Sequence, residues 1–377
     1  MLITKSDNFD RFRCIAGKCP DSCCAGGWQI IIDEDSLELY RASGDSVLDE
    51  RLRKGVNWQE EYFNTDEQGR CSMLNENGLC SIQLTLGEKA LCDTCGRYPR
   101  HVEEYEDVRE YSLSLSCPEA ARIILERKEP LTFFDPETDE AEEFEDFDYL
   151  LYAKLLDARE VLYRIIQDRS IGFREKAGRI REFAAGLQVC VDADRMFDMD
   201  RLIYGADDAV NYAAAKANAN AAVDNAAASE AQVREMVDTV RGDNSSELPI
   251  MGYGLKKPLE KNAFSRLFEM EMLKPGWADV LNRTWEAWND ELVLSAEEEI
   301  QAEQLMIFWI YTYFCGAVYD GWIYSKALLA ICSTWWILQI NAANSFEGGI
   351  IEAAYRYARE IEHSDENLNA LEEIFIE

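Results

Sequence analysis

The sequence predicts a mainly α protein in which an irregular, cysteine-rich metal-binding module with short strands precedes an all-helical domain. Nine of the twelve cysteines lie before residue 118, whereas in the second half apolar residues recur at the three- and four-residue steps of a helix. A chain of 377 residues accommodates about two domains. We therefore expect the module at residues 1–128, an acidic linker at 129–146 and the helical domain at 147–377.

Short local signals predict the elements of the module. The apolar run Trp28–Ile32 suits a short strand, and Asp33–Arg41 begins as a helix. The pair Asn77-Gly78 favours a tight hairpin turn because it tolerates positive φ angles, and Cys71 would then face Cys80. Residues 116–119, Ser-Cys-Pro-Glu, have the pattern of a capping box ahead of a helical run.

Long helices are predicted for the second half. Tyr149–Asp168 and Phe173–Cys190 carry apolar residues at helical spacing. Within residues 205–247, the Ala- and Asn-rich part is compatible with either an exposed helix or a flexible insertion, because composition alone does not separate the two.

Two strongly apolar stretches, Met306–Tyr319 and Trp322–Ile340, are separated by Asp320-Gly321, which is typical of the turn of a helical hairpin. The second stretch is nearly long enough to cross a membrane, but Lys326 and Ser333 interrupt it. We expect a buried core hairpin, with peripheral membrane contact as the alternative.

Charge and the N-terminal segment restrict partners and location. Lys and Arg number 38 against 72 Asp and Glu, which gives a net charge of −34. Such a surface repels nucleic acid, favours cationic partners and also keeps a protein soluble. The first twelve residues, MLITKSDNFDRF, have no apolar signal segment. We expect a cytoplasmic protein with reduced thiols, and the sequence is compatible with an oligomer.

The cysteine spacing predicts a metal site with sulfur ligands. The pattern is C-x4-C-x3-C-C, C-x8-C, C-x11-C-x2-C and a single later cysteine. Four thiolates hold a zinc ion or a cubane cluster, and the chain has only two histidines, so both zinc and iron–sulfur remain open. Nine thiols exceed one site and are enough for two. The candidate ligands are Cys14, Cys19, Cys23, Cys24, Cys71, Cys80, Cys92, Cys95 and Cys117.

The adjacent pair Cys23-Cys24 is unsuited to a single metal because successive side chains diverge, so we expect one of the two to serve another role. The later cysteines Cys190, Cys315 and Cys332 stand singly in apolar surroundings and are expected to pack as small hydrophobes.

Several familiar catalytic patterns are missing. The sequence has no C-x3-C-x2-C run, no G-x-G-x-x-G after a strand and no Ser/His/Asp arrangement. Near the cysteines, Arg97 and Arg100 flank Tyr98-Pro99 and are candidates for gripping a carboxylate, the alternative being a rigid turn with surface arginines. Trp28 is a candidate pocket wall, and core packing is its alternative role.

The segments CIAGKCPDSCCAGGWQIIID, CSMLNENGLCSIQLTLGEKALCDTCGRYPR and SLSLSCPEAARIIL resemble the flagellin lysine-N-methylase (FliB-type) family. This family belongs with a wider group of cysteine-rich zinc- or iron-chelating proteins. The resemblance is strongest over residues 14–125 and continues weakly in the apolar stretch that ends near Asp320-Gly321.

The resemblance implies a SAM-dependent methyltransferase that carries a [4Fe–4S] cluster on the nine module cysteines and modifies lysine ε-amines of flagellin or of another protein with accessible lysines. For S-adenosyl-L-methionine, our own candidate binding residues are Arg97 and Arg100, whose planar guanidinium groups match its carboxylate, together with Tyr98 and Trp28. The resemblance does not identify the four ligands, and the residue that accepts the lysine proton stays unknown. The rival hypothesis is a binding protein that chelates zinc or iron without catalysis.

Overall fold

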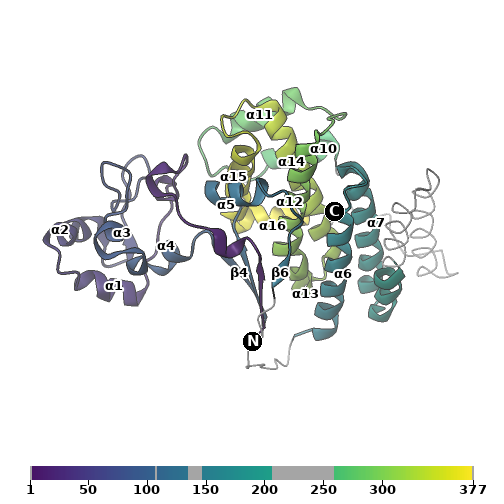
Figure 1. The fold of residues 1–377 in the computed structure, drawn as a ribbon, viewed down its shortest axis with the longest axis horizontal. Coiled ribbons are helices and arrows are strands. Elements are labelled where there is room, and N and C mark those ends of the chain that lie inside the picture. The colour runs from purple at the N-terminus through teal and green to yellow at the C-terminus, as the bar shows by residue number, and fades with distance from the viewer. Residues whose placement is uncertain (1, 107, 135–146, 206–258, 376–377) are drawn as a thin grey trace.

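The computed structural model describes residues 2–106, 108–134, 147–205 and 259–375 (Figure 1). A small body that carries the first four helices lies beside a larger helical body, and a small sheet runs along the larger one (Figure 1). The predicted fold class is confirmed. Residues 135–146 of the expected linker and residues 206–247 of the Ala- and Asn-rich segment lie outside the described residues.

The small body is built from short elements around its own apolar core. Its helices begin at side-chain caps: the Asp33 carboxylate accepts from the Ser36 N–H at 2.9 Å, and Asp45 caps the next helix. Leu37, Leu52 and Met73 are almost fully buried there. The elements are α1 (Glu34–Arg41), α2 (Ser46–Gly55), β2 (Val56–Asn57), β3 (Tyr62–Phe63), α3 (Ser81–Leu86), α4 (Asp93–Arg97) and the 3-10 turns η2 (Ala16–Lys18), η3 (Cys23–Ala25) and η4 (Glu88–Ala90). The earlier turn η1 (Phe9–Arg11) contacts the sheet, and Phe9 belongs to the core of the larger body.

A four-stranded sheet joins the chain start to the larger body. Its order is β4 (Arg100–Tyr105), β5 (Val108–Leu113), β1 (Leu2–Ser6) and β6 (Phe133–Phe134). β4 and β5 form an antiparallel hairpin, β1 runs parallel to β5, and β6 runs antiparallel to β1. Buried side chains of these strands belong to the same core as the long helices. The expected boundaries at 128 and 146 remain a prediction, and β6 lies inside the expected linker.

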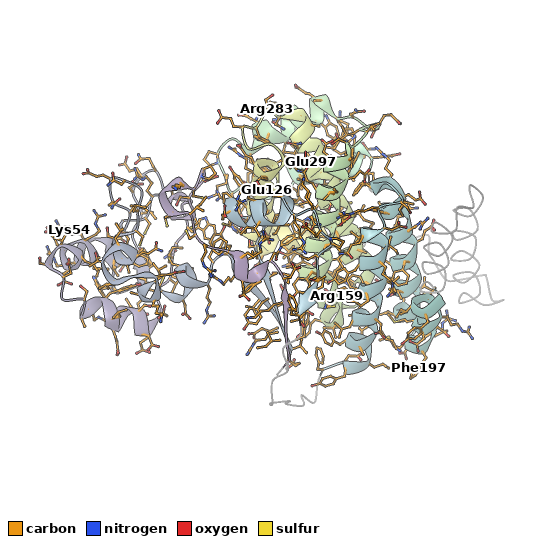
Figure 2. The ribbon with its side chains drawn as sticks, viewed as in Figure 1. Lys54, Glu126, Arg159, Phe197, Arg283 and Glu297 are labelled. Carbon is orange, nitrogen blue, oxygen red and sulfur yellow. The ribbon has the colours of Figure 1, made fainter. Side chains whose placement is uncertain are left out.

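The sheet is tied to the helices by a buried ion pair. Both guanidinium nitrogens of Arg159, on α6 (Tyr149–Gln167), donate to the two carboxylate oxygens of Glu110 on β5 at 2.5 Å. Figure 2 places Arg159 inside the larger body. Such a bidentate pair fixes the position of the helix on the sheet.

The remaining helices pack mainly around α14 (Ile323–Ala343). α7 begins at Phe173, as expected, and α6 begins at Tyr149. A full capping box between Ser295 and Glu298 starts α12. The elements are α5 (Pro118–Leu125), α7 (Phe173–Asp192), η5 (Met196–Asp198), α10 (Lys261–Phe264), η7 (Ser265–Phe268), α11 (Trp277–Ala287), α12 (Ala296–Tyr313), η8 (Phe314–Gly316), α13 (Ala317–Asp320), α14 (Ile323–Ala343), α15 (Gly349–Glu362) and α16 (Asp365–Glu373).

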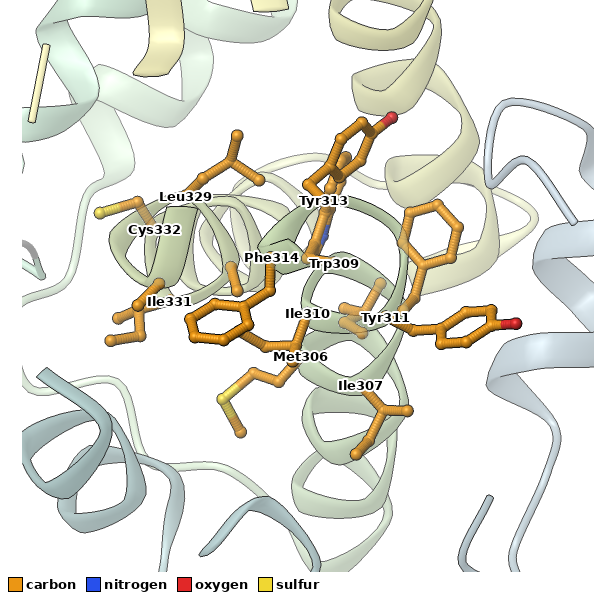
Figure 3. Close-up of a cluster of buried hydrophobic side chains, with 14 of the residues drawn as sticks. Met306, Ile307, Trp309, Ile310, Tyr311, Tyr313, Phe314, Leu329, Ile331 and Cys332 are labelled. Atoms are coloured by element: carbon orange, nitrogen blue, oxygen red, sulfur yellow. The ribbon is translucent and has the colours of Figure 1, made fainter. Parts of the chain in front are cut away.

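The apolar hairpin of α12 and α14 forms the centre of the core, as predicted. Trp309, Ile310 and Phe314 pack together there (Figure 3), and Gly321 turns the chain with a φ of 75°. α14 is long and apolar enough to cross a membrane, but its apolar window is 100% buried inside the protein, which is the environment of a core helix. The buried Lys326 pairs with Asp320 and Glu372 at 2.9 and 2.8 Å.

Three local expectations in the module are wrong. Trp28–Ile32 contributes one isolated bridge, from Ile31 to Tyr62, instead of a strand. The turn near Gly78 is present, but the backbone partner of Cys80 is Leu74 and not Cys71, because the turn folds over the Asn75 side chain. The capping box at Ser116 does not form, because its N–H donates to Glu362 and its hydroxyl bonds to Ser114 and Tyr98.

Candidate metal centre

Eight of the nine N-terminal cysteines line one cavity of about 130 Å³. It lies where the first loop, the hairpin near Gly78, α4 and the start of α5 meet. Cys92 is fully buried beside Cys95, at the start of the same helix. The other eight predicted ligands line the cavity wall: Cys14, Cys19, Cys23, Cys24, Cys71, Cys80, Cys95 and Cys117.

The first loop presents four of these thiols through short turns. The Ser22 hydroxyl accepts from the Cys24 N–H at 3.2 Å and starts η3 at Cys23. The Cys19 thiol donates to the Asp21 carbonyl at 3.4 Å, and the Ala16 N–H donates to the Cys14 sulfur at 3.4 Å. Because turns replace regular structure here, closely spaced cysteines can face a common space.

A second set of thiols comes from the hairpin and from α4. The Cys71 N–H donates to the Cys24 carbonyl at 2.8 Å, which joins the hairpin to the first loop. Cys92 is the N-cap of α4 and Cys95 lies in its first turn, so the C-x2-C spacing places both thiols at one helix end. Cys80 caps α3 in the same body.

The helical domain contributes a buried guanidinium to the same place. Arg359, on α15, is 3% exposed. It donates to the Ser116 carbonyl at 2.9 Å and to the Asp21 carbonyl at 2.8 Å, and pairs with the Asp21 carboxylate at 2.6 Å. One side chain therefore holds the loop before Cys23 against the start of the helix that carries Cys117.

Burial controls the protonation of most of these thiols. It raises the pKa of Cys71 to about 12 and that of Cys117 to about 11. The hydrogen bond from Cys23 lowers the pKa of Cys24 to about 7, although burial opposes this effect. Thiols that are crowded and kept neutral in this way bind a metal by exchanging protons for the positive charge of the ion.

The donor set suits a sulfur-ligated group, but the thiols do not converge on one point. Among the described residues, no three His, Cys, Asp or Glu side chains are placed to share a single metal ion. Loading therefore requires rotation of thiol side chains around a cavity that is already lined with sulfur. The number of donors, their proximity and the near absence of histidine fit an iron–sulfur cluster or zinc.

The predicted cofactor residues separate into two environments. Trp28, Tyr98 and Arg100 line the cavity, and the rings of Trp28 and Tyr98 meet edge-to-face at 5.0 Å. The Arg100 guanidinium lies 5.3 Å from the Phe12 ring and forms no ion pair within the described part of the chain. Arg97 instead lies on the outside of α4, where it pairs with Asp93 at 2.7 Å.

The sequence analysis missed a group of residues at the end of α15. The ring of His363 lies 4.1 Å from that of Trp28, and Glu362 accepts from the Ser116 N–H and the Ser114 hydroxyl, both at 3.1 Å. Burial raises the pKa of Glu362 to about 7, and burial lowers that of His363 to about 3. The sequence feature that could have pointed to this group is His363, one of only two histidines in the chain.

The three later cysteines behave as predicted. Cys190, Cys315 and Cys332 are fully buried in the helical core. Burial raises the pKa of each of their thiols. They are small apolar packing groups away from the cavity.

A larger helical body tied by a buried arginine to a cavity lined with thiols defines a mainly helical protein with a cysteine-rich N-terminal module. Comparison with protein families identifies residues 159–377 as a FliB lysine N-methylase C-terminal domain. The chain therefore belongs to the FliB lysine N-methylase family, and the resemblance seen in the cysteine segments is confirmed.

Individual relatives match a shorter part of the chain. A lysine-N-methylase of Salmonella typhimurium is 35% identical over 132 residues, which cover 33% of each protein. The flagellar biosynthetic protein FliU of Salmonella muenchen is also 35% identical over 132 residues, 33% of this chain and 78% of FliU. The match thus spans about a third of the length of the curated lysine-N-methylase. No solved structure matches this chain.

Proposed function

We propose that this protein is a cytoplasmic, SAM-dependent protein-lysine N-methyltransferase that acts on flagellin ε-amines and depends on a [4Fe–4S] cluster. The observation that carries the proposal is the cavity that collects eight module thiols and contacts the family's C-terminal domain through Arg359. The names of the relatives, lysine-N-methylase and flagellar biosynthetic protein, support the reaction and the substrate.

The ligands of the cluster come from the cysteines that line the cavity. When bound, the cluster supplies electron-transfer chemistry at a potential set by nearby hydrogen bonds and by solvent exposure. The protein supplies orientation and charge around it. Arg359 places a buried positive charge close to Cys19 and offsets part of the negative charge that thiolates bring.

The methyl donor is proposed to bind along the cavity wall formed by Trp28, Tyr98 and Arg100. A guanidinium matches the planar carboxylate of SAM bidentately, and Arg100 has no competing carboxylate partner among the described residues. The Trp28 ring offers an aromatic face to the sulfonium cation. Arg97 was an equal candidate from sequence, but its ion pair with Asp93 makes it the weaker one.

A hydrogen-bonded chain provides the route for the proton that lysine methylation releases. The Tyr98 hydroxyl, on the cavity wall, bonds to the Ser116 hydroxyl at 3.0 Å, which bonds to the Ser114 hydroxyl at 2.5 Å. The Ser114 hydroxyl donates to the Glu362 carboxylate at 3.1 Å. A carboxylate with a pKa of about 7 accepts a proton near neutral pH, so Glu362 is the proposed proton acceptor.

The competing function is a non-catalytic protein that chelates zinc or iron. Nine cysteines exceed the four that one cluster needs, which favours metal storage over a single catalytic site. The two functions differ in whether the protein binds SAM.

The test uses anaerobically reconstituted protein, labelled SAM and purified flagellin. We expect stoichiometric iron and sulfide, SAM binding and label on flagellin lysines. Arg100→Lys should raise the SAM dissociation constant at least about tenfold, a loss of about 1.4 kcal/mol, with iron content unchanged. Arg97→Lys is the matched control and should bind SAM like the wild type. Stoichiometric zinc without iron would exclude the cluster, and absent SAM binding would favour the chelator.

A further inference from the structure

One group of thiols belongs to the core of the small body. Cys92 is part of that core, together with Met73 and Ile82. Cys71, Cys80 and Cys95 are partly buried and pack against this core. The backbone bond from Cys71 to the Cys24 carbonyl adds Cys24 to this group. Burial raises the pKa of Cys71 to about 12, and the thiols that add to this effect are Cys24, Cys80 and Cys92. These five cysteines therefore form one connected group around Cys24 and Cys92.

A second group of thiols lies at the contact with the helical domain. Cys117 belongs to the core of the larger body, not to that of the small one. Arg359 holds Ser116, next to Cys117, and Asp21, which accepts from the Cys19 thiol. Besides burial and backbone hydrogen bonds, the nearby thiols of Cys19 and Cys14 influence the pKa of Cys117.

The two groups meet at the adjacent pair in the first loop. The Cys23 thiol bonds to that of Cys24, and its further thiol neighbours are Cys14 and Cys117. The thiol neighbours of Cys71, Cys80 and Cys95 include Cys24. Apart from their bond to each other, Cys23 therefore has its thiol neighbours in the contact group and Cys24 has its thiol neighbours in the group of the small body.

We propose that the cavity holds two separate tetrathiolate metal sites instead of one. The contact site uses Cys14, Cys19, Cys23 and Cys117. The module site takes four thiols from Cys24, Cys71, Cys80, Cys92 and Cys95. The two-site proposal rests on the metal-binding part of the proposed function and is independent of methyl transfer.

The two sites differ in their surroundings and therefore in their proposed roles. The contact site adjoins the guanidinium of Arg359 and, through Ser116, the hydroxyl of Tyr98 on the cavity wall. The module site lies among apolar side chains of a small core, where a bound metal contributes folding free energy. The contact site is therefore the one positioned for chemistry, and the module site stabilises the small body.

The experiment titrates Co²⁺ into reduced, metal-free, full-length protein under anaerobic conditions and follows the thiolate-to-cobalt absorption band. Wild type should saturate at two equivalents of Co²⁺. The module variant Cys71→Ser/Cys80→Ser and the contact variant Cys19→Ser/Cys117→Ser should each saturate at one equivalent. The control Cys190→Ser, a buried cysteine away from the cavity, should keep both.

Saturation of the wild type at one equivalent overturns the proposal, and so does loss of both equivalents in a folded double variant. Circular dichroism identifies variants that do not fold, and the wild-type stoichiometry then decides the question. Methyl transfer from labelled SAM is measured separately. Two equivalents without methyl transfer would contradict only the proposed enzyme, whereas methyl transfer with one equivalent would contradict only the second site.

Discussion

Replacing Glu362 by Gln tests the proton route, with Glu360→Gln as its matched control. Both carboxyl groups lie near the end of α15, and burial raises the pKa of each to about 7 from an ordinary value of 4.5. They differ in their partners. Glu362 is reached from the cavity wall through Ser114 and Ser116, whereas Glu360 accepts from the Leu273 backbone N–H at 2.7 Å.

Both substitutions should have the same effect on how the free energy of unfolding depends on pH. A raised pKa means that the folded state keeps its proton between pH 4.5 and about 7 while the unfolded state loses it. The free energy of unfolding therefore falls as the pH rises through this window. At about 1.4 kcal/mol per pKa unit, each group costs up to about 3 kcal/mol above pH 7. Each variant should lose one such contribution, seen as a smaller decline in stability between about pH 5 and about pH 8 in denaturant titrations.

Only one substitution should affect the reaction. Glu362→Gln should lower the rate of methyl transfer by about 10²–10⁴, the range of a positioned general base, and should remove the rise in wild-type activity near pH 7. Glu360→Gln should keep the wild-type rate and pH profile. The readout is single-turnover transfer from labelled SAM across this pH range. Equal losses in both variants, or full activity in Glu362→Gln, would refute the proton route.

Three further predictions concern the metal site and the fold. Cys92→Ser should reduce metal content and stability while Cys315→Ala leaves metal content unchanged, as measured by metal analysis; equal losses would contradict the division between the module thiols and the thiols of the helical core. Arg159→Met should lower the free energy of unfolding by about 3–5 kcal/mol because it leaves Glu110 buried and unpaired, and a double variant with Glu110→Leu should recover most of the loss. Arg359→Lys should lower metal content, because an ammonium group cannot replace the three planar contacts that the guanidinium makes with Ser116 and Asp21 and so cannot hold the cysteine loops together. Metal retention at the wild-type level would contradict this positioning role of Arg359.

Local patterns were sufficient to predict several of the helices. The starts of α6 and α7 and the turn at Gly321 follow from apolar spacing and from the backbone freedom of glycine, which act over a few residues. The parallel pairing of β1 with β5 was not predicted, because it joins residues about a hundred positions apart and no local signal encodes it.

The candidate site could be predicted only in its composition. Clustered cysteines indicated a thiolate site, but their spacing did not indicate which of them are neighbours, because that depends on how two bodies meet. Arg359 and Glu362 reach the cavity region from more than 240 positions along the chain. In sequence they are ordinary charged residues of an amphipathic helix.

The end of α15 has a consequence for how this family varies. Arg359 contacts the first loop and the start of α5, Glu362 bonds to Ser114 and Ser116, and His363 packs on Trp28. A substitution at any of these positions disturbs a partner encoded far away in the gene. Homologous sequences should therefore show coevolution between the last turn of α15 and residues 19–28 and 114–117, and chimaeras that exchange the two bodies between distant relatives should need both segments from one parent.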